Sequence, residues 1–226
     1  MKFFSRDKEP SDPAIIVSRC LKFLVNRITD NLTGEGYCWR KPWGVKRFES
    51  MVLSKFILDY SFEQIVKDQL SENEKIGYYV LSNQTFSSMF NVEFSKVGMS
   101  YEDMKEEIQN KVKAYITALG PDSQPPECYH QIYMLITGSL SREELEKEAT
   151  KKTAGLEIMR NNEYFAPMVT QYEDSIKYLK EQIVALDMID IILPHMIRSA
   201  RQKVKSINLN KIKSLSKKIA KKDKNK

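Results

Sequence analysis

The sequence predicts an all-α protein: an irregular multi-helix bundle built around a long, kinked C-terminal helix, with a basic C-terminal tail. Gly and Pro number only 8 each among 226 residues, which favours helices over a turn-rich β architecture. Apolar residues also recur at steps of three and four along much of the chain, and this is the period of an amphipathic helix.

The N-terminal part carries a clear helix start. Asp12 offers an N-cap acceptor, and Pro13 then occupies the first helical position, where its missing N–H costs nothing. Apolar residues follow at helical spacing, at Val17, Leu21, Leu24, Ile28 and Leu32. Gly34 and Gly36 are expected to end this helix, and the polar residues 1–12 are expected to be flexible.

The next part of the chain predicts a loop followed by helices. Residues 37–44 form the loop and hold both tryptophans. A second helix follows with Phe48 and Val52 on a wide apolar face, and a capping pattern at 61–64 indicates a helix restart. Residues 71–99 are aromatic and mixed in pattern, and we expect two short helices there.

The middle of the chain contains two further helix starts. One helix opens at Ser100 and closes at the Gly-Pro pair 120–121. A short helix is expected at 126–137 after a linker. Ser141 and Glu144 have the spacing of a capping box, which predicts the start of an acidic, solvated helix.

The longest helix signal covers residues 167–207. Its apolar residues alternate steps of four and three, as in a seam packed against other helices. The seam consists of Phe165, Val169, Tyr172, Ile176, Leu179, Ile183, Leu186, Asp190, Leu193, Ile197, Ala200, Val204 and Ile207, of which only Asp190 is charged. Pro194 cannot donate a hydrogen bond to the carbonyl of Asp190, so we expect a kink there.

Charge is unevenly placed and sets the expected domain organisation. Residues 201–226 hold 11 Lys and Arg with one Asp, a net charge of +10, and the other 25 basic and 29 acidic residues leave a net −4 for 1–200. We therefore expect a single α-helical domain at 13–200 and a Lys-rich amphipathic tail at 201–226. The overall pI consequently says nothing about the partners of the domain.

The tail is a candidate attachment segment for an anionic partner. Its candidate residues are Lys203, Lys205, Lys211, Lys213, Lys217, Lys218, Lys221 and Lys222. A basic amphipathic helix suits an anionic membrane surface, an acidic protein groove or a nucleic-acid backbone, and the alternative is a solvated terminus that only aids solubility. The tail has no aromatic residue, which argues against deep membrane insertion and against base stacking.

Asp190 is the most unusual single residue of the long helix. A carboxylate on an apolar seam is costly to bury unpaired. One interpretation is a tuned acid or ligand contact beside His195 at the kink. The other, which we favour, is an ion pair with Lys or Arg of another helix, or an edge position that reaches water.

A metal site is a weak candidate at Glu127 and His130. The Glu-x-x-His spacing places both on one helix face, as in di-iron bundles, but those need a second such pair. The second histidine, His195, has Ile192 where the glutamate would stand, so no metal or cofactor is predicted. The cysteines, Cys20, Cys38 and Cys128, lack a metal-binding spacing and are interpreted as reduced thiols of a cytoplasmic protein.

The tryptophan loop is a candidate recognition surface. It places Trp39 and Trp43 beside Arg40 and Lys41. If this group is exposed, it could stack on bases or anchor a partner. If it is buried, its aromatic rings attach the loop to the core. The sequence favours burial.

The sequence therefore predicts a non-enzymatic, adaptor- or scaffold-type interaction protein, with a basic tail for an anionic partner. It has no Gly-rich phosphate loop, nucleophile elbow, His-Glu-x-x-His or transmembrane segment. A protein partner is expected, and a homo-oligomer is compatible with the long seam. One alternative is a nucleic-acid-associated protein that binds phosphates through the tail. Another is an enzyme or metal site near Asp190 and His195 or near Glu127 and His130.

Overall fold

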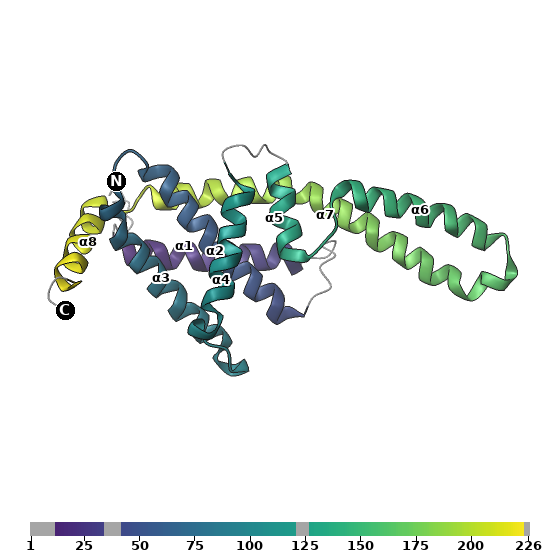
Figure 1. The fold of residues 1–226 in the computed structure, drawn as a ribbon, viewed down its shortest axis with the longest axis horizontal. Coiled ribbons are helices and arrows are strands. Elements are labelled where there is room, and N and C mark those ends of the chain that lie inside the picture. The colour runs from purple at the N-terminus through teal and green to yellow at the C-terminus, as the bar shows by residue number, and fades with distance from the viewer. Residues whose placement is uncertain (1–11, 34–41, 121–126, 224–226) are drawn as a thin grey trace, which may run out of the picture. The chain divides into compact units, whose positions relative to one another are not determined.

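The computed structural model describes residues 12–33, 42–120 and 127–223, and these ranges contain helices and no strand. The α-helices are α1 (Pro13–Thr33), α2 (Trp43–Val66), α3 (Glu72–Phe94), α4 (Tyr101–Ala118), α5 (Glu127–Thr137), α6 (Arg142–Arg160), α7 (Ala166–Val204) and α8 (Leu209–Asp223). The predicted all-α class with a long, kinked C-terminal helix is confirmed (Figure 1). Over the same ranges, every helix is too short or too polar to cross a bilayer.

The predicted helix starts are confirmed by their hydrogen bonds. The Asp12 carboxylate accepts the backbone N–H of Ala14 at 2.9 Å ahead of α1. The Ser141 hydroxyl accepts the Glu144 N–H at 3.3 Å, and the Glu144 carboxylate accepts the Ser141 N–H at 2.9 Å, which completes a capping box for α6. These local hydrogen bonds set where the helices begin, and most of the helices' stability comes from the burial of their apolar faces.

Three predicted boundaries are wrong. Residues 72–94 form the single helix α3 instead of two short ones. Tyr78, Phe86 and Phe90 of this segment are all buried, and their burial stabilises a continuous helix despite the mixed sequence pattern. The capping pattern at 61–64 starts no helix, since those residues lie inside α2. The long helix ends at Val204, and a turn separates it from α8.

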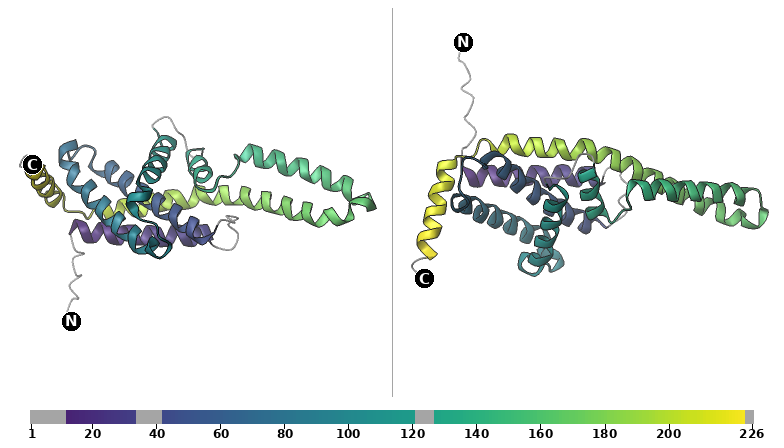
Figure 2. Two further views of the ribbon diagram at one scale, coloured as in Figure 1. Left: turned by 60° about the horizontal axis from the view of Figure 1, so that its bottom comes forward. Right: turned by 45° about the horizontal axis from the view of Figure 1, so that its top comes forward.

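The chain divides into two compact units. The first consists of residues 1–28, 50–112 and 195–226, and the second of residues 29–49 and 113–194. Helices α1, α2, α4 and α7 each contribute residues to both, and Pro194 is the last α7 residue of the second unit. Residues 201–223, expected as a separate tail, lie in the first unit, where α8 lies beside α3 (Figures 1 and 2).

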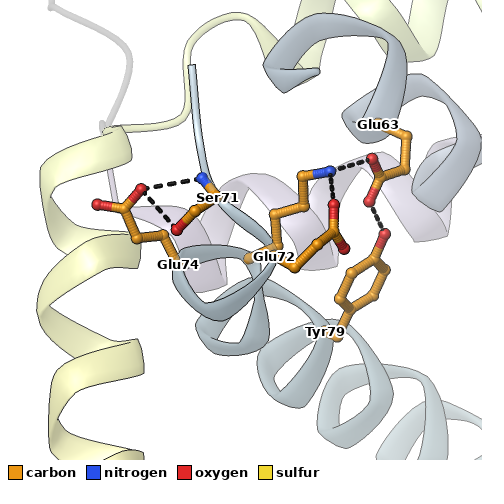
Figure 3. A network of polar contacts seen from close by, with 6 residues as sticks. Glu63, Ser71, Glu72, Glu74 and Tyr79 are labelled. Atoms are coloured by element: carbon orange, nitrogen blue, oxygen red, sulfur yellow. Dashed lines mark hydrogen bonds and ion pairs between the residues drawn. The ribbon is translucent and has the colours of Figure 1, made fainter. Parts of the chain in front are cut away.

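Aromatic packing and a polar network join α2 to α3 in the first unit. The rings of Phe62 and Tyr78 stack with their centroids 3.5 Å apart. Asp59 accepts hydrogen bonds from Tyr78 at 3.1 Å and from Ser82 at 2.8 Å. The second part of the network is centred on Glu63, which accepts hydrogen bonds from Tyr79 and, at 2.8 Å, from Lys75 (Figure 3).

The second unit contains an antiparallel pair formed by α6 and the first part of α7 (Figures 1 and 2). Arg142, at the start of α6, forms an ion pair with Asp187, and Arg160, at its end, forms one with Glu173. The order of the partners is reversed along α7, as an antiparallel pair requires.

Candidate functional site

The connection between α7 and α8 fixes where α8 begins. The backbone N–H of Lys205 donates to the Arg201 carbonyl at 3.0 Å, and that of Ile207 donates to the Val204 carbonyl at 2.9 Å. The Asn208 carboxamide oxygen then caps α8 by accepting the N–H of Asn210 at 3.0 Å. These bonds make residues 205–208 a tight turn, so α8 has a defined start next to the end of α7.

The apolar side of α8 is buried against α3. Ile212 has no exposed surface, and the Ser216 hydroxyl donates to the Glu74 carbonyl at 2.7 Å and accepts the Gly77 N–H at 2.8 Å. A Cβ added at Gly77 would lie 2.7 Å from the Ile212 carbonyl oxygen, so only glycine fits this approach of the two helices. Consequently the apolar stripe of α8 is used inside the first unit.

An ion pair supports the same contact at its rim. Lys213 lies 3.2 Å from the Glu74 carboxylate, which Figure 3 shows directed towards α8. The Ser71 backbone N–H, then the Lys213 side chain, lower the pKa of Glu74. This carboxylate therefore stays charged at neutral pH and gives Lys213 a structural role.

Four lysines of α8 point away from α3. They are Lys217, Lys218, Lys221 and Lys222, which we call the lysine face; all four are exposed. At 100° per residue they span an arc of about 140°, roughly opposite Ile212 and Ser216. Within the described part of the chain, no acidic side chain forms an ion pair with any of them.

The other four predicted tail lysines have different surroundings. The Lys203 ammonium lies 5.1 Å from the centre of the Phe23 ring, and Lys211 lies 3.5 Å from the Asp12 carboxylate. Lys213 pairs with Glu74, and Lys205 lines a cleft at the α7–α8 turn. Of the predicted set, the lysine face is thus the exposed group of lysines that lies on one side of α8, apart from this cleft.

The structure pairs Asp190 with His130. One oxygen of the Asp190 carboxylate lies 3.1 Å from His130 Nε2, while the other is buried and has no hydrogen-bond partner among the residues that the structure describes. His195, expected beside Asp190, is exposed and belongs to the first unit. The ion-pair branch of the favoured interpretation is therefore wrong in its partner, which is a histidine 60 residues away in the sequence. The other branch, an edge position that reaches water, fits the Asp190 side chain, of which 30% is exposed.

The metal candidates do not assemble into a ligand set in the described ranges. Glu127 is exposed, and His130 faces Asp190 instead. In the same part of the chain, no three His, Cys, Asp or Glu side chains group closely enough to hold a metal ion. Burial is the main cause that raises the pKa of the neighbouring Cys128, against smaller opposing hydrogen bonds from the backbone, so the thiolate form is disfavoured.

The tryptophan loop falls largely outside the described residues. Trp39, Arg40 and Lys41 lie outside them, as does Cys38. Trp43 is the first residue of α2 instead of a loop residue, and 59% of its surface is exposed, contrary to the expected burial.

The partly buried polar network of α2 and α3 has the properties of a structural contact between the two helices. Burial is the main cause that raises the pKa values of Tyr78 and Tyr79. Hydrogen bonds to Glu63 and Glu72 raise the pKa of Lys75. These shifts hold the tyrosines neutral and the lysine charged, whereas a base or nucleophile needs the opposite shifts. Sequence reasoning missed this network, because its pairs come from different helices.

The comparisons with known proteins add no family or relative. The chain matches no protein-family model, no curated protein and no solved structure. The site must therefore be interpreted from its own geometry.

Proposed function

We propose that this chain is a non-enzymatic, α-helical interaction protein that attaches to an anionic partner through the lysine face of α8. The observation that carries this proposal is the division of α8 into two sides. One side buries Ile212 and Ser216 against α3, and the other presents four lysines without ion-pair partners among the described residues.

Electrostatics supports attachment through this face. Residues 1–200 carry a net −4 and residues 201–226 a net +10, so the positive potential is concentrated at the C-terminal end of the chain. Because the lysines are exposed, their attraction for a partner is screened over about 8 Å at physiological salt. Binding should therefore be strong at low salt and weak at high salt.

The packing of α8 disfavours insertion of this helix into a bilayer. An amphipathic helix enters a bilayer with its apolar side, but in α8 that side faces α3. The contact with a partner is then purely electrostatic, as with a nucleic-acid backbone, lipid headgroups or an acidic protein surface.

A protein partner for the helical body is supported by an exposed apolar row on α7. Val184, Met188 and Ile191 follow the helical steps of four and three, and 54%, 37% and 65% of their surfaces are exposed. A row of this kind suits the apolar side of a partner helix.

The test compares two variants of equal charge. In the first, the lysine face is changed by Lys217→Gln, Lys218→Gln, Lys221→Gln and Lys222→Gln. In the control, four exposed lysines of α6 and α7 are changed by Lys147→Gln, Lys151→Gln, Lys177→Gln and Lys180→Gln. Binding to duplex DNA, to RNA and to phosphatidylserine vesicles is measured at low and moderate salt.

The proposal predicts that the wild-type chain and the control bind at least one of these polyanions, and that the lysine-face variant does not. Binding to DNA or RNA without binding to vesicles would make the protein a nucleic-acid-associated one. Equal loss in both variants would show that net charge alone acts, and the lysine face would lose its role.

A further inference from the structure

A cleft opens in the first unit between the end of α2, the end of α7 and the start of α8. Its volume is about 530 Å³, a size that suits a small organic ligand. Its polar lining consists of Gln64, Gln69, Arg201 and Lys205, and the rest of the lining is aliphatic, including Val204 and Ile207. Among the described residues, the lining contains two cations and no acid, which gives the cleft a positive charge.

Arg201 lies in this lining, and no carboxylate of the described residues forms an ion pair with it. Its guanidinium carbon lies 5.9 Å from the centre of the Tyr60 ring, which holds the group by a cation–π contact. Its Nε is buried and has no hydrogen-bond acceptor in the described part of the chain. No described acceptor therefore offsets the charge of Arg201 at this N–H, and its positive charge stays available to an anion that enters the cleft.

Lys205 and the start of α8 add to the positive charge. The bond from the Lys205 N–H to the Arg201 carbonyl sets the two residues one helical turn apart. Leu209, the first residue of α8, also lines the cleft, so the positive end of the α8 dipole lies at the site. The Asn208 side chain already binds the first N–H groups of α8, so the helix contributes through its dipole more than through free donors.

We infer that this cleft binds the phosphate monoester group of an organic ligand. Two cations and a helix N-terminus match a charge near −2, which a phosphate monoester carries above its second pKa of about 6 and a carboxylate does not. Arginine offers a planar fork that suits phosphate oxygens, and the glutamines add neutral donors. The aliphatic lining favours a phosphate on an apolar body over inorganic phosphate.

This binding is separate from the proposed role of the lysine face. Lys205 and Arg201 line the cleft, whereas Lys217, Lys218, Lys221 and Lys222 do not. The phosphate monoester has two possible sources, a soluble metabolite or the headgroup of phosphatidic acid, and both present the same group.

Calorimetric titration of the full chain with phenyl phosphate tests the inference, with phenol as the ligand that lacks the phosphate. Phenyl phosphate should bind saturably, and phenol should not. Arg201→Gln should weaken binding about tenfold or more, the effect expected for a lost charged hydrogen bond. Arg201→Lys, which keeps the charge but loses the fork, should fall between wild type and Arg201→Gln, and Lys217→Gln should stay within about twofold of wild type.

The pH dependence supplies a second readout. Binding should weaken as the pH falls through about 6, because the phosphate dianion gains a proton while the arginine stays charged. Far-UV circular dichroism shows whether Arg201→Gln still folds; if it does not, Arg201→Lys and the pH profile carry the test. Absence of saturable binding, or an equal loss in Lys217→Gln and Arg201→Gln, would overturn the inference.

Vesicles distinguish the two sources. Stronger binding to phosphatidic acid than to phosphatidylserine at matched surface charge, dependent on Arg201, identifies the lipid headgroup. Equal binding to both vesicles, together with saturable binding of phenyl phosphate, identifies a soluble ligand. If phenyl phosphate still binds to the lysine-face variant, the ligand site of the cleft does not depend on the lysine face. This inference can then hold even where the proposed function fails.

Discussion

At the scale of single residues, the hydrogen-bond and ion-pair partners of a side chain are the feature that the sequence predicts least well. Asp190 stands out on an apolar seam, and its need for a partner was predictable from that alone. The partner itself, His130, lies on α5 and was assigned to a metal hypothesis instead. Periodicity places residues on faces but does not say which two faces meet, so neither this pair nor the Lys75–Glu63 pair could be predicted.

Cys20 gives a prediction at this scale. Burial raises the pKa of its thiol from 9.0 to about 12, against a smaller opposing effect of Lys203. At pH 8 the reactive thiolate would then be about one part in ten thousand of the total. In a Cys38→Ser, Cys128→Ser chain, Cys20 should react with a thiol reagent far more slowly when folded than in guanidinium at the same pH.

Labelling at equal rates in the folded and denatured chains would show that Cys20 is accessible. The expected protection, by contrast, would confirm the buried core contact of α1, where Cys20 has no exposed surface.

At the scale of helices, starts were predicted more accurately than ends and continuity. Asp12, Ser100 and Ser141 begin helices through local hydrogen bonds that the sequence displays. Continuity depends on tertiary burial: α3 runs through a mixed pattern because its aromatic side chains pack against neighbouring helices. The division between α7 and α8 was missed because Val204 and Ile207 are both buried and both fit the seam.

The contact between α3 and α8 gives a prediction for the substitution Gly→Ala. At Gly77 it should change the free energy of unfolding in the direction opposite to that at an ordinary helix position. In a helix interior, Gly→Ala ordinarily stabilises by about 0.5–1 kcal/mol. At Gly77 the new Cβ would lie 2.7 Å from the Ile212 carbonyl oxygen, and backbone cannot move aside cheaply. Gly77→Ala should therefore lower the free energy of unfolding by about 1–3 kcal/mol, the usual cost of overpacking.

Gly155→Ala is the matched control. Its Cβ would lie 3.5 Å from a Tyr172 ring carbon, an ordinary contact, so the helix preference for alanine should prevail and the free energy of unfolding should rise. Urea unfolding of both variants measures the difference. Stabilisation by Gly77→Ala would mean that α8 does not approach α3 as closely as described.

At the scale of the whole molecule, charge segregation was visible in the sequence, but its structural setting was not. The net +10 of residues 201–226 predicted a Lys-rich amphipathic tail outside the domain, and in the structure Ile212 of α8 is fully buried in the first unit. Deleting residues 201–226 would therefore expose core surface as well as remove charge. Lys→Gln variants change the charge alone and are the better probe.

The salt dependence of binding to a short duplex DNA tests the central claim most directly. Each lysine that contacts a phosphate contributes about −0.9 to the slope of log Kobs against log salt concentration. We predict that changing Lys217, Lys218, Lys221 and Lys222 to Gln makes the slope shallower by about 3 to 4, whereas the α6–α7 control keeps the wild-type slope. Equal slopes for wild type and the lysine-face variant, or no binding even at low salt, would contradict attachment to a nucleic-acid polyanion through the lysine face of α8.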